Sequence, residues 1–427
     1  MGNVTVASGV TLTVEAGVVV RINNGLSITA QAGGTIDVEG TAVNPVQFMP
    51  LTGNNNWGTI NASGNNSFIT IRHAEISHGG VSLGSQSTGL IEDTYVHDVG
   101  SAIVGNSAKF VTMRRVHVSF YSETIFNSGT VVLAEDSLFE NQTAGSSDAL
   151  EIQNGPPGSI IRRCTFRHST GSNSDAVDCN GSTNVFVHDC LIYDFTDKGC
   201  SFGTATAFNQ PAAVGMVVSN CLIYGVDSCI AVKDVSTASI YHNTFVNSAY
   251  GVRLYQKYST PVAGGGGRIT NAHDNIIWGN ATNLLIATNS SMVATYSDIG
   301  GTNFPGAGNL STDPLFLSVP ARDYRLATNS PAAGTGLAGA TMGAHFPVGA
   351  PMALSHPRIE SETISNGVAT VRFWADSEKT YTLQVSSLAS GGTWTTVTNV
   401  PTRALPVLVE VNTSPGSGNH FFRLQTP

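Results

Sequence analysis

Charged residues are scarce in this chain. Asp, Glu, Lys and Arg make up 11% of its 427 residues, and the formal net charge is -9. The chain therefore lacks the clustered Lys and Arg with which proteins neutralise nucleic-acid phosphates, so we expect no nucleic-acid partner. An anionic substrate would need a local cationic patch or a bound metal.

Long apolar runs are absent as well. No run approaches the roughly 18 residues that are needed to cross a bilayer, and Met1 and Gly2 lead straight into strand-like sequence without a signal-peptide pattern. We therefore expect no membrane span.

Cysteine is rare and confined to one part of the chain. All six cysteines lie between residues 164 and 229, with no CxxC pair and no paired His spacing typical of zinc sites. A metal site built on sulfur is not expected. Cys164, Cys190 and Cys221 share one inward position and read as small core residues, with disulfides between coils as the alternative.

Glycine, by contrast, is abundant at 46 residues, and Ser, Thr, Asn and Val recur throughout, which is typical of an all-β chain with many tight turns. Short alternating segments also repeat every 22 to 30 residues. Alternation with a period of two indicates strands with one face inward. The segments are "GGVSLG" (79–84), "SAIVGN" (101–106), "ETIFNS" (123–128), "DALEIQ" (148–153), "DAVDCN" (175–180), "KGCSFG" (198–203), "SCIAVK" (228–233) and "YGVRLY" (250–255).

A second strand-like segment precedes each of these, for example "IRRCTFRH" and "VHDCLIYD", and the connections are too short for helices. This pattern predicts an all-β fold, a right-handed parallel β-helix of ten or more coils, over residues 1–349. After a Pro-rich linker, residues 350–427 show alternating strands separated by Gly, Pro, Ser and Asn. They predict a small C-terminal β-sandwich as an accessory module.

The glycine-rich opening, "VTVASGVTLTVEAGVVVRINNGLSITAQAGGTIDVEGTAVNPVQF", resembles the first coils of the pectate-lyase-like β-helix superfamily. The segment "DPLFLSVPARDYRLATNSPAAGTG" (313–336) resembles the part that closes many such solenoids. The resemblance implies a secreted or cell-surface carbohydrate-active bacterial protein, whose export signal is missing from this sequence, with a polysaccharide as its substrate. We expect it to be a monomer.

Acidic residues align in two outward columns of the predicted solenoid. Equivalent residues of successive coils stack about 4.8 Å apart, so adjacent repeats place their side chains in contact. Four acids then form a two-by-two square: Asp148, Glu151, Asp175 and Asp178. Such acids repel one another unless a cation neutralises them or a raised pKa keeps one protonated. Irregular oxygen ligands of this kind suit Ca²⁺, so we expect all four to hold calcium.

Lys198 follows Asp175 in the first column and is a candidate base. Arg253 lies further along the second column, beyond Ser201 and Ala231, and is a candidate clamp for a substrate carboxylate. The resemblance sharpens here, because calcium-dependent pectate lyases of the β-helix type also carry an aspartate on one coil, a DxxD-like pair on the next and a lysine base beyond. Asp148, Asp175 and Asp178 match the ligand positions, whereas the base belongs in the column that Ser201 occupies. The catalytic residues expected here are Lys198, Arg253 and Asp178.

A second column, on the preceding strand, reads Phe139, Arg167, Tyr193, Tyr224, Val246 and Trp278. Aromatic rings exposed along a groove would stack on sugar rings. The predicted substrate-binding residues are Arg167, Tyr193, Tyr224, His188 and His242. The structural alternatives are that the tyrosines are covered by loops and that the acids and histidines only bond to turns.

The sequence is compatible with three functions. A calcium-dependent lyase would cleave an acidic, uronate polysaccharide by β-elimination. A glycoside hydrolase would use two of the carboxylates on a neutral glycan. A non-catalytic solenoid would bind a glycan or act as a surface spacer.

Overall fold

The computed structural model describes residues 2–204, 211–258, 265–301, 303–350, 359–365, 367–375, 380–388, 392–401, 407–416 and 418–425. The chain divides into two compact units, one of Met1–Leu315 with Leu326–Pro351 and one of Phe316–Arg325 with Met352–Pro427. Among the described residues, no helix is long and apolar enough to cross a membrane.

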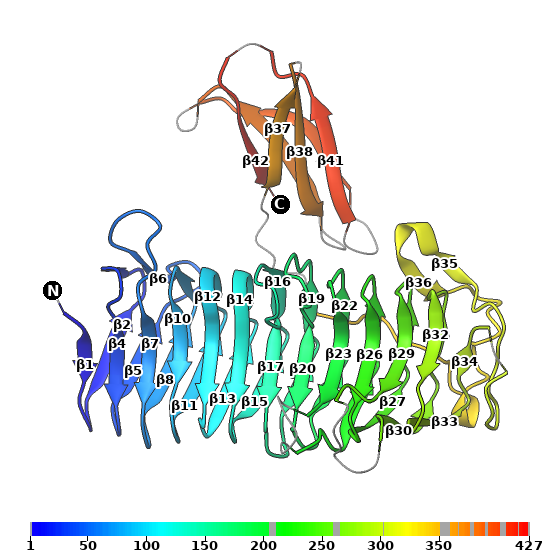
Figure 1. Cartoon of the computed structure of the whole chain (residues 1–427). Coiled ribbons are helices and arrows are strands. Elements are labelled where there is room, and N and C mark those ends of the chain that lie inside the picture. Colours follow the sequence, from blue (N-terminus) through cyan, green and yellow to red (C-terminus); the bar gives the residue numbers. More distant parts are fainter. Residues whose placement is uncertain are drawn as a thin grey trace. The chain divides into compact units, whose positions relative to one another are not determined.

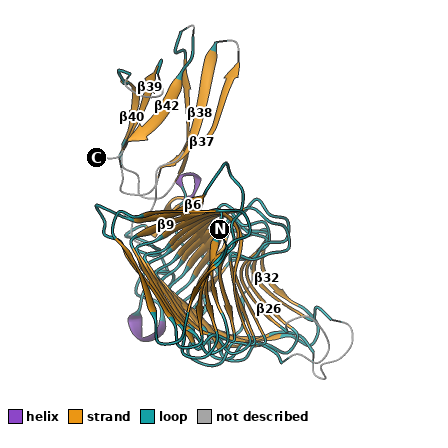
Figure 2. Ribbon diagram, turned by 90° about the vertical axis from the view of Figure 1, so that its left-hand side faces the viewer, coloured by secondary structure: helices purple, strands orange, loops and turns teal. Residues whose placement is uncertain are grey.

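The first unit is a solenoid in which each coil contributes strands to three parallel ladders (Figure 1). Figure 2 looks along the stack of coils and shows the strands lining its sides. Ladder 1 consists of β1 (Val4–Val6), β4 (Ile28–Gln31), β7 (Thr59–Ser63), β10 (Gly80–Leu83), the later parts of β12 (Tyr95–Asn106) and β14 (His117–Asn127), β17 (Leu150–Gln153), β20 (Val177–Asn180), β23 (Lys198–Gly203), β26 (Ser228–Lys233), β29 (Tyr250–Tyr255) and β32 (Thr282–Ile286).

Ladder 2 is a separate 12-stranded sheet. It consists of β2 (Thr11–Glu15), β5 (Thr35–Glu39), β8 (Phe68–Arg72), β11 (Thr88–Glu92), β13 (Phe110–Arg114), β15 (Val131–Glu135), β18 (Ile160–Arg162), β21 (Phe186–His188), β24 (Met216–Ser219), β27 (Thr237–Tyr241), β30 (Arg268–His273) and β33 (Ser291–Thr295).

Ladder 3 joins ladder 1 through the two long strands β12 and β14, which belong to both. It consists of β3 (Val19–Ile22), β6 (Val46–Pro50), β9 (Ala74–Ser77), the earlier parts of β12 and β14, β16 (Leu138–Gln142), β19 (Thr165–Arg167), β22 (Leu191–Tyr193), β25 (Leu222–Tyr224), β28 (Thr244–Val246), β31 (Ile276–Trp278) and β34 (Asp298–Ile299). The predicted parallel β-helix of ten or more coils is confirmed.

The second unit contains two small antiparallel sheets. One orders β37 (Ile359–Ser365), β38 (Val368–Ala375) and β41 (Val407–Thr413), and the other orders β40 (Thr395–Val400), β39 (Tyr381–Ser386) and β42 (Phe421–Gln425). Buried side chains of both sheets, among them Phe373 and Leu383, share one hydrophobic cluster. A further two-stranded sheet pairs β35 (Phe316–Ser318) with β36 (Asp323–Leu326), and two short 3-10 helices span Val319–Ala321 and Leu337–Gly339.

The solenoid interior is built from columns of apolar side chains in register. Leu150, Val177, Cys200, Ile230 and Val252 are paired from coil to coil on ladder 1, and each is fully buried. Burying such a side chain stabilises the fold by about 1.5–3 kcal/mol. The interior stack that the alternation predicted is therefore present.

The corner between ladders 2 and 3 turns on a single left-handed residue per coil, for example Arg163 (φ 49), Asp189 (φ 57) and Asp274 (φ 58). The next residue points inward and bonds back to the backbone, as when the Cys190 thiol donates to the His188 carbonyl over 3.3 Å. All six cysteines are buried and free, so they act as core residues and form no disulfides.

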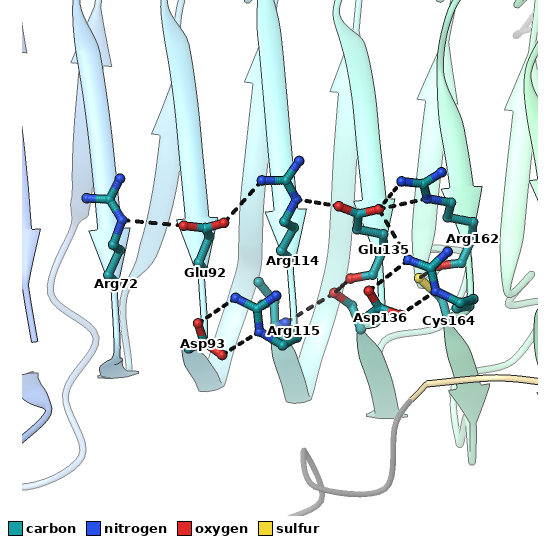
Figure 3. Close-up of polar contacts among 12 residues, drawn as sticks. Arg72, Glu92, Asp93, Arg114, Arg115, Glu135, Asp136, Arg162 and Cys164 are labelled. Carbon is teal, nitrogen blue, oxygen red and sulfur yellow. Dashed lines mark hydrogen bonds and ion pairs between the residues drawn. The ribbon is translucent and has the colours of Figure 1, made fainter. Parts of the chain in front are cut away.

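Outside this corner, opposite charges alternate along the coils (Figure 3). Glu92 accepts hydrogen bonds from Arg72 over 3.4 Å and from Arg114 over 3.3 Å, and Glu135 is paired with Arg114 and Arg162. In the adjoining column Arg115 binds Asp93 through two bonds of 2.7 Å. Adjacent coils thus carry opposite charges that attract one another, whereas a column of like charges would be destabilised by repulsion.

The segment that closes the solenoid runs back along the outside of ladder 3. The Ala344 amide donates to Thr244 Oγ1 over 2.9 Å, and the Ala350 amide donates to Thr165 Oγ1 over 2.9 Å. Gly349 has φ 94, and a Cβ there would lie 2.6 Å from Thr165 Oγ1. Glycine is needed at this position both for its backbone conformation and for the close approach.

The interior column makes a direct stability prediction. Ile69 of β8 is 1% exposed, whereas its neighbour Phe68 is 44% exposed. Ile69→Ala should lower the free energy of unfolding by about 2–5 kcal/mol, because it leaves a cavity in a packed interior. Phe68→Ala should cost less although it removes the larger side chain. Chemical denaturation of both variants checks the order, and an equal or reversed order would contradict the assigned inward face.

Candidate functional site

The four acids of the predicted square meet on the outer side of ladder 1. Glu151 of β17 pairs with Asp178 of β20. Just before these strands, Asp148 Oδ1 accepts the Asp175 amide over 2.8 Å, and Asp175 Oδ1 accepts the Lys198 amide over 2.9 Å. The first-column acids thus bond to the backbone of the following coil as well as facing their neighbours.

Burial and mutual repulsion raise the pKa values of Asp148, Glu151 and Asp175. Asp175 and Asp178 are 6% and 5% exposed. Burial, and then the charges of Asp178 and Asp175, raise the pKa of Asp148 to about 9. Burial likewise raises the pKa of Glu151 to about 7, and burial with the Asp178 charge raises the pKa of Asp175 to about 6. A cation that replaces the protons on these acids would therefore stabilise the cluster.

Three of the acids are placed to share one ion. Asp148, Asp175 and Asp178 each offer an oxygen, and these oxygens lie within 4.8 Å of one another. Asp178 Oδ2 bonds to Asn180, but Asp178 Oδ1 is buried and has no hydrogen-bond partner. A buried, unpartnered carboxylate oxygen among other carboxylates fits a hard cation such as Ca²⁺.

Lys198, the base expected from the sequence, is held by two carboxylates. Its Nζ lies 3.3 Å from Asp175 Oδ1 and forms a short ion pair with Asp197. Burial favours the neutral amine, but Asp175 and Asp197 outweigh it and raise the pKa of Lys198 above its ordinary value.

A second lysine, which the sequence reading missed, reaches the same cluster. Lys233, at the end of β26, is 4% exposed and donates from Nζ to Ser201 Oγ over 2.8 Å. Ser201 is the register partner of Asp178. Gly203 makes room for the lysine, since a Cβ there would lie 2.7 Å from Lys233 Cε. Lys233 is visible in the sequence as the last residue of "SCIAVK". Its place in that repeat does not match the columns of the acids, so the sequence did not indicate that its side chain reaches them.

Arg253 belongs to the Asp178 column but lies three coils further, paired in turn through Ser201 and Ala231. That spacing corresponds to about 14 Å at one strand separation per coil. Its guanidinium lies over the Tyr250 and Tyr255 rings, 4.7 and 4.8 Å from their centroids, and donates to Asp227 over 3.1 Å. The Arg253 guanidinium is therefore held by Asp227 and two tyrosines and does not belong to the acid cluster.

The expected aromatic platform is wrong. Tyr193 and Tyr224 are fully buried and stack on each other with centroids 5.0 Å apart. Arg167 is 3% exposed and forms an ion pair with Glu140 at 2.6 Å. These three side chains pack within the protein and offer no open face to a sugar ring.

The register of this column also differs from the sequence alignment. Phe139 pairs with Phe166 in the interior, and Glu140 takes the position opposite Arg167. Similarly, Ile125 and not Phe126 pairs with Glu151, because a bulge shifts the register between β12 and β14.

The two predicted substrate-binding histidines lie away from ladder 1. His188 ends β21 on ladder 2, where its Nδ1 is 2.7 Å from Asp189 Oδ2. His242 lies at the corner between ladders 2 and 3, two coils after Asp189. It lies beside His345 of the closing segment, with ring centroids 4.8 Å apart. Neither histidine joins the acid cluster.

A family model described as "Right handed beta helix region" matches residues 102–299, which include the acid cluster and both lysines. The match confirms the right-handed parallel β-helix fold that the sequence predicts. The resemblance to the pectate-lyase-like superfamily stays a prediction. Among curated proteins, no match was found.

Solved structures of similar fold include the catalytic domain of a GH87 alpha-1,3-glucanase in complex with nigerose, at 13% identity and a TM-score of 0.36, covering 69% of this chain and 64% of that one. Pectate lyase Pel9A is 12% identical with a TM-score of 0.35, covering 78% and 82%. An alginate lyase from Paenibacillus sp. str. FPU-7 is 11% identical with a TM-score of 0.22, covering 67% and 99%. These likenesses are too weak to assign an activity.

The raised pKa values predict how stability depends on pH. Asp148 and Glu151 titrate at about 9 and about 7 in the folded protein, but near their ordinary value of about 4 when unfolded. The folded state therefore binds more protons, and in EDTA the melting temperature should fall as the pH rises from about 5 to 9. Calcium at a hundredfold excess over its Kd should restore about 2.7 kcal/mol.

The variant Asp148→Asn tests whether the acid cluster causes this pH dependence. It removes the carboxyl with the highest pKa, so it should flatten the pH dependence in EDTA and abolish the stabilisation by calcium. Melting curves that coincide with and without calcium at pH 8 would contradict the metal assignment.

Proposed function

We propose that this protein is a calcium-dependent polysaccharide lyase that cleaves an acidic, uronate polysaccharide by β-elimination. The observation that carries the proposal is the cluster of Asp148, Asp175 and Asp178, whose ligand oxygens lie within 4.8 Å of one another, with two lysines beside it. Because polymeric glycans are met outside cells, we also propose a secreted or cell-surface location.

The donor set fits Ca²⁺, because it consists of carboxylates at irregular spacing and includes the unpartnered Asp178 Oδ1. Glu151 lies next to Asp178 and would add a fourth acid to the site. When bound, Ca²⁺ supplies positive charge that draws electrons from a uronate carboxylate and so acidifies its C5 proton.

The reaction needs a base for that proton. As the base removes it, a C4–C5 double bond forms, the C4–O4 bond breaks, and the leaving oxygen takes a proton from solvent. A lysine can act as base only when its pKa falls toward the working pH. The question is which of the two lysines loses its neighbouring negative charge when the acids are occupied.

Lys233 meets this condition better than Lys198. Within the described ranges its Nζ donates to the neutral Ser201 hydroxyl, and burial favours its neutral form. What raises the pKa of Lys233 is the charge of Asp178 and Asp175, which are the acids proposed to hold the ion. We therefore propose Lys233 as the base.

Lys198 has a different role in this proposal. Its ion pair with Asp197 lies outside the acid cluster and would persist after Asp175 is neutralised. That contact keeps the amine protonated, so Lys198 acts by holding Asp175 and Asp197 in place. Greater exposure is the one feature that favours Lys198 as the base, since Lys233 is 4% exposed and Lys198 8%.

A retaining glycoside hydrolase is the second candidate, and two observations favour it. The raised pKa of Asp148, about 9, keeps a proton available for a leaving group at neutral pH. The oxygens of the three aspartates lie within 4.8 Å. This is closer than the roughly 6.5–9.5 Å between the carboxyls of inverting enzymes.

The lyase prediction is tested on uronate polymers by the ultraviolet absorbance of the unsaturated product. Wild type should be active with calcium and inactive in EDTA. Lys233→Ala should lower kcat by about 10²- to 10⁴-fold, the usual contribution of a general base, while calcium still raises its melting temperature.

Lys198→Ala is the matched comparison, because it removes the same group from the same cluster and should cost less in kcat. A larger loss for Lys198→Ala than for Lys233→Ala would reverse the assignment. New reducing ends from a neutral glycan without ultraviolet absorbance would replace the lyase by the hydrolase, and no product from any glycan would leave a binding solenoid.

A further inference from the structure

A second cluster of ligand-bearing side chains lies at the corner between ladders 2 and 3, in the last coils. This corner carries the Arg115–Asp93 pair in earlier coils (Figure 3). In the later coils the same corner positions hold His242 and Asp274, and His273 ends the adjoining strand β30. No metal-ligand spacing links these histidines in the sequence, because they lie in different coils. The stacking of the coils brings them together.

The three side chains are close enough to bind one ion. His242, His273 and Asp274 each offer a ligand atom, and these atoms lie within 4.8 Å of one another. Asp274 Oδ2 is 2.7 Å from His273 Nδ1 and 3.5 Å from His242 Nε2. A tetrahedral ion with bonds of about 2.0–2.2 Å sets its ligands roughly 3.4 Å apart, so only small shifts are needed.

The carboxylate is buried and already oriented. The Asp274 side chain is 2% exposed, and its Oδ1 accepts the Leu337 amide over 2.6 Å. Its Oδ2 faces the two imidazoles, whose side chains are 28% and 23% exposed. A ligand held by a second hydrogen bond is typical of metal sites, where outer contacts fix the ligand's direction.

The closing segment contacts the residues of this corner. Besides the Leu337 contact, the Gly343 amide donates to the Asp274 carbonyl over 2.7 Å. His345 lies beside His242, with ring centroids 4.8 Å apart, and its Nε2 lies 3.1 Å from the Thr341 carbonyl. The cluster therefore sits where the returning segment is fastened to the coils.

We propose that His242, His273 and Asp274 form a binding site for a divalent transition metal ion, with Zn²⁺ as the representative, that fastens the closing segment to the solenoid. Two imidazole nitrogens and one carboxylate select such ions over Ca²⁺, which prefers oxygen ligands alone. The site differs in chemistry and in ladder from the acid cluster, so it does not depend on the proposed lyase activity.

Isothermal titration of the full-length, EDTA-stripped protein with Zn²⁺ tests the proposal, with Co²⁺ as a spectroscopic probe. Wild type should bind one equivalent, and Co²⁺ should give visible absorption. His273→Gln should weaken binding by at least about 100-fold, because loss of a mere outer-shell partner already costs 10- to 100-fold. Zn²⁺ should raise the melting temperature of wild type and not of His273→Gln.

His188→Gln is the matched control. His188 faces Asp189 at the same 2.7 Å as His273 faces Asp274. The corner residue of the preceding coil, however, is Arg163 for this pair, where His242 precedes Asp274. His188→Gln should bind Zn²⁺ like wild type, as should Asp175→Asn, which changes the acid cluster of ladder 1 and leaves the histidine cluster intact. Absence of saturable Zn²⁺ binding in wild type, or equal binding in the folded His273→Gln variant, would overturn the proposal.

Discussion

Parallel pairing in register is the constraint on which everything else in this solenoid depends. Each residue on a ladder lies about 4.8 Å from its equivalents in the coils before and after. Inside, this rule produces the stack of Leu150, Val177 and Cys200. Outside, it forces polar residues of equal position together, so a column must alternate its charges, bond to the backbone or hold an ion.

The two outer surfaces described above solve this problem differently. Near the corner of ladders 2 and 3, Arg114 lies between Glu92 and Glu135, and the charges compensate one another. On ladder 1, Glu151 and Asp178 are adjacent acids without an arginine between them. Buried carboxylates kept together without full compensation are costly for folding, and such arrangements concentrate at functional sites. This contrast separates the acid cluster from an ordinary surface ladder.

The sequence was sufficient for the features that repeat. Alternation located the interior columns, and the spacing of "DALEIQ" and "DAVDCN" brought Asp148, Glu151, Asp175 and Asp178 together. It failed where the repeat is broken or where a side chain leaves its own coil. The bulge between β12 and β14 moved Phe126 out of its column.

The comparison of the repeats also could not predict contacts made by long side chains or by segments distant in sequence. Lys233 crosses to Ser201, which lies 32 residues earlier. Tyr193 and Tyr224 are outward in the strand alternation yet fully buried, because alternation reports which way a side chain points and not what covers it. The histidine cluster depends likewise on the closing segment, which meets Asp274 from 63 residues away.

The central claim, that the acid cluster of ladder 1 is a calcium site, is tested most directly by a crystal structure determined in the presence of Ca²⁺. The account predicts one ion with oxygens of Asp148, Asp175 and Asp178 at about 2.3–2.6 Å, completed by water. It also predicts that Lys233 keeps its place at Ser201 while Asp178 Oδ1 gains the ion as its partner. A cluster without an ion at millimolar calcium would contradict the account.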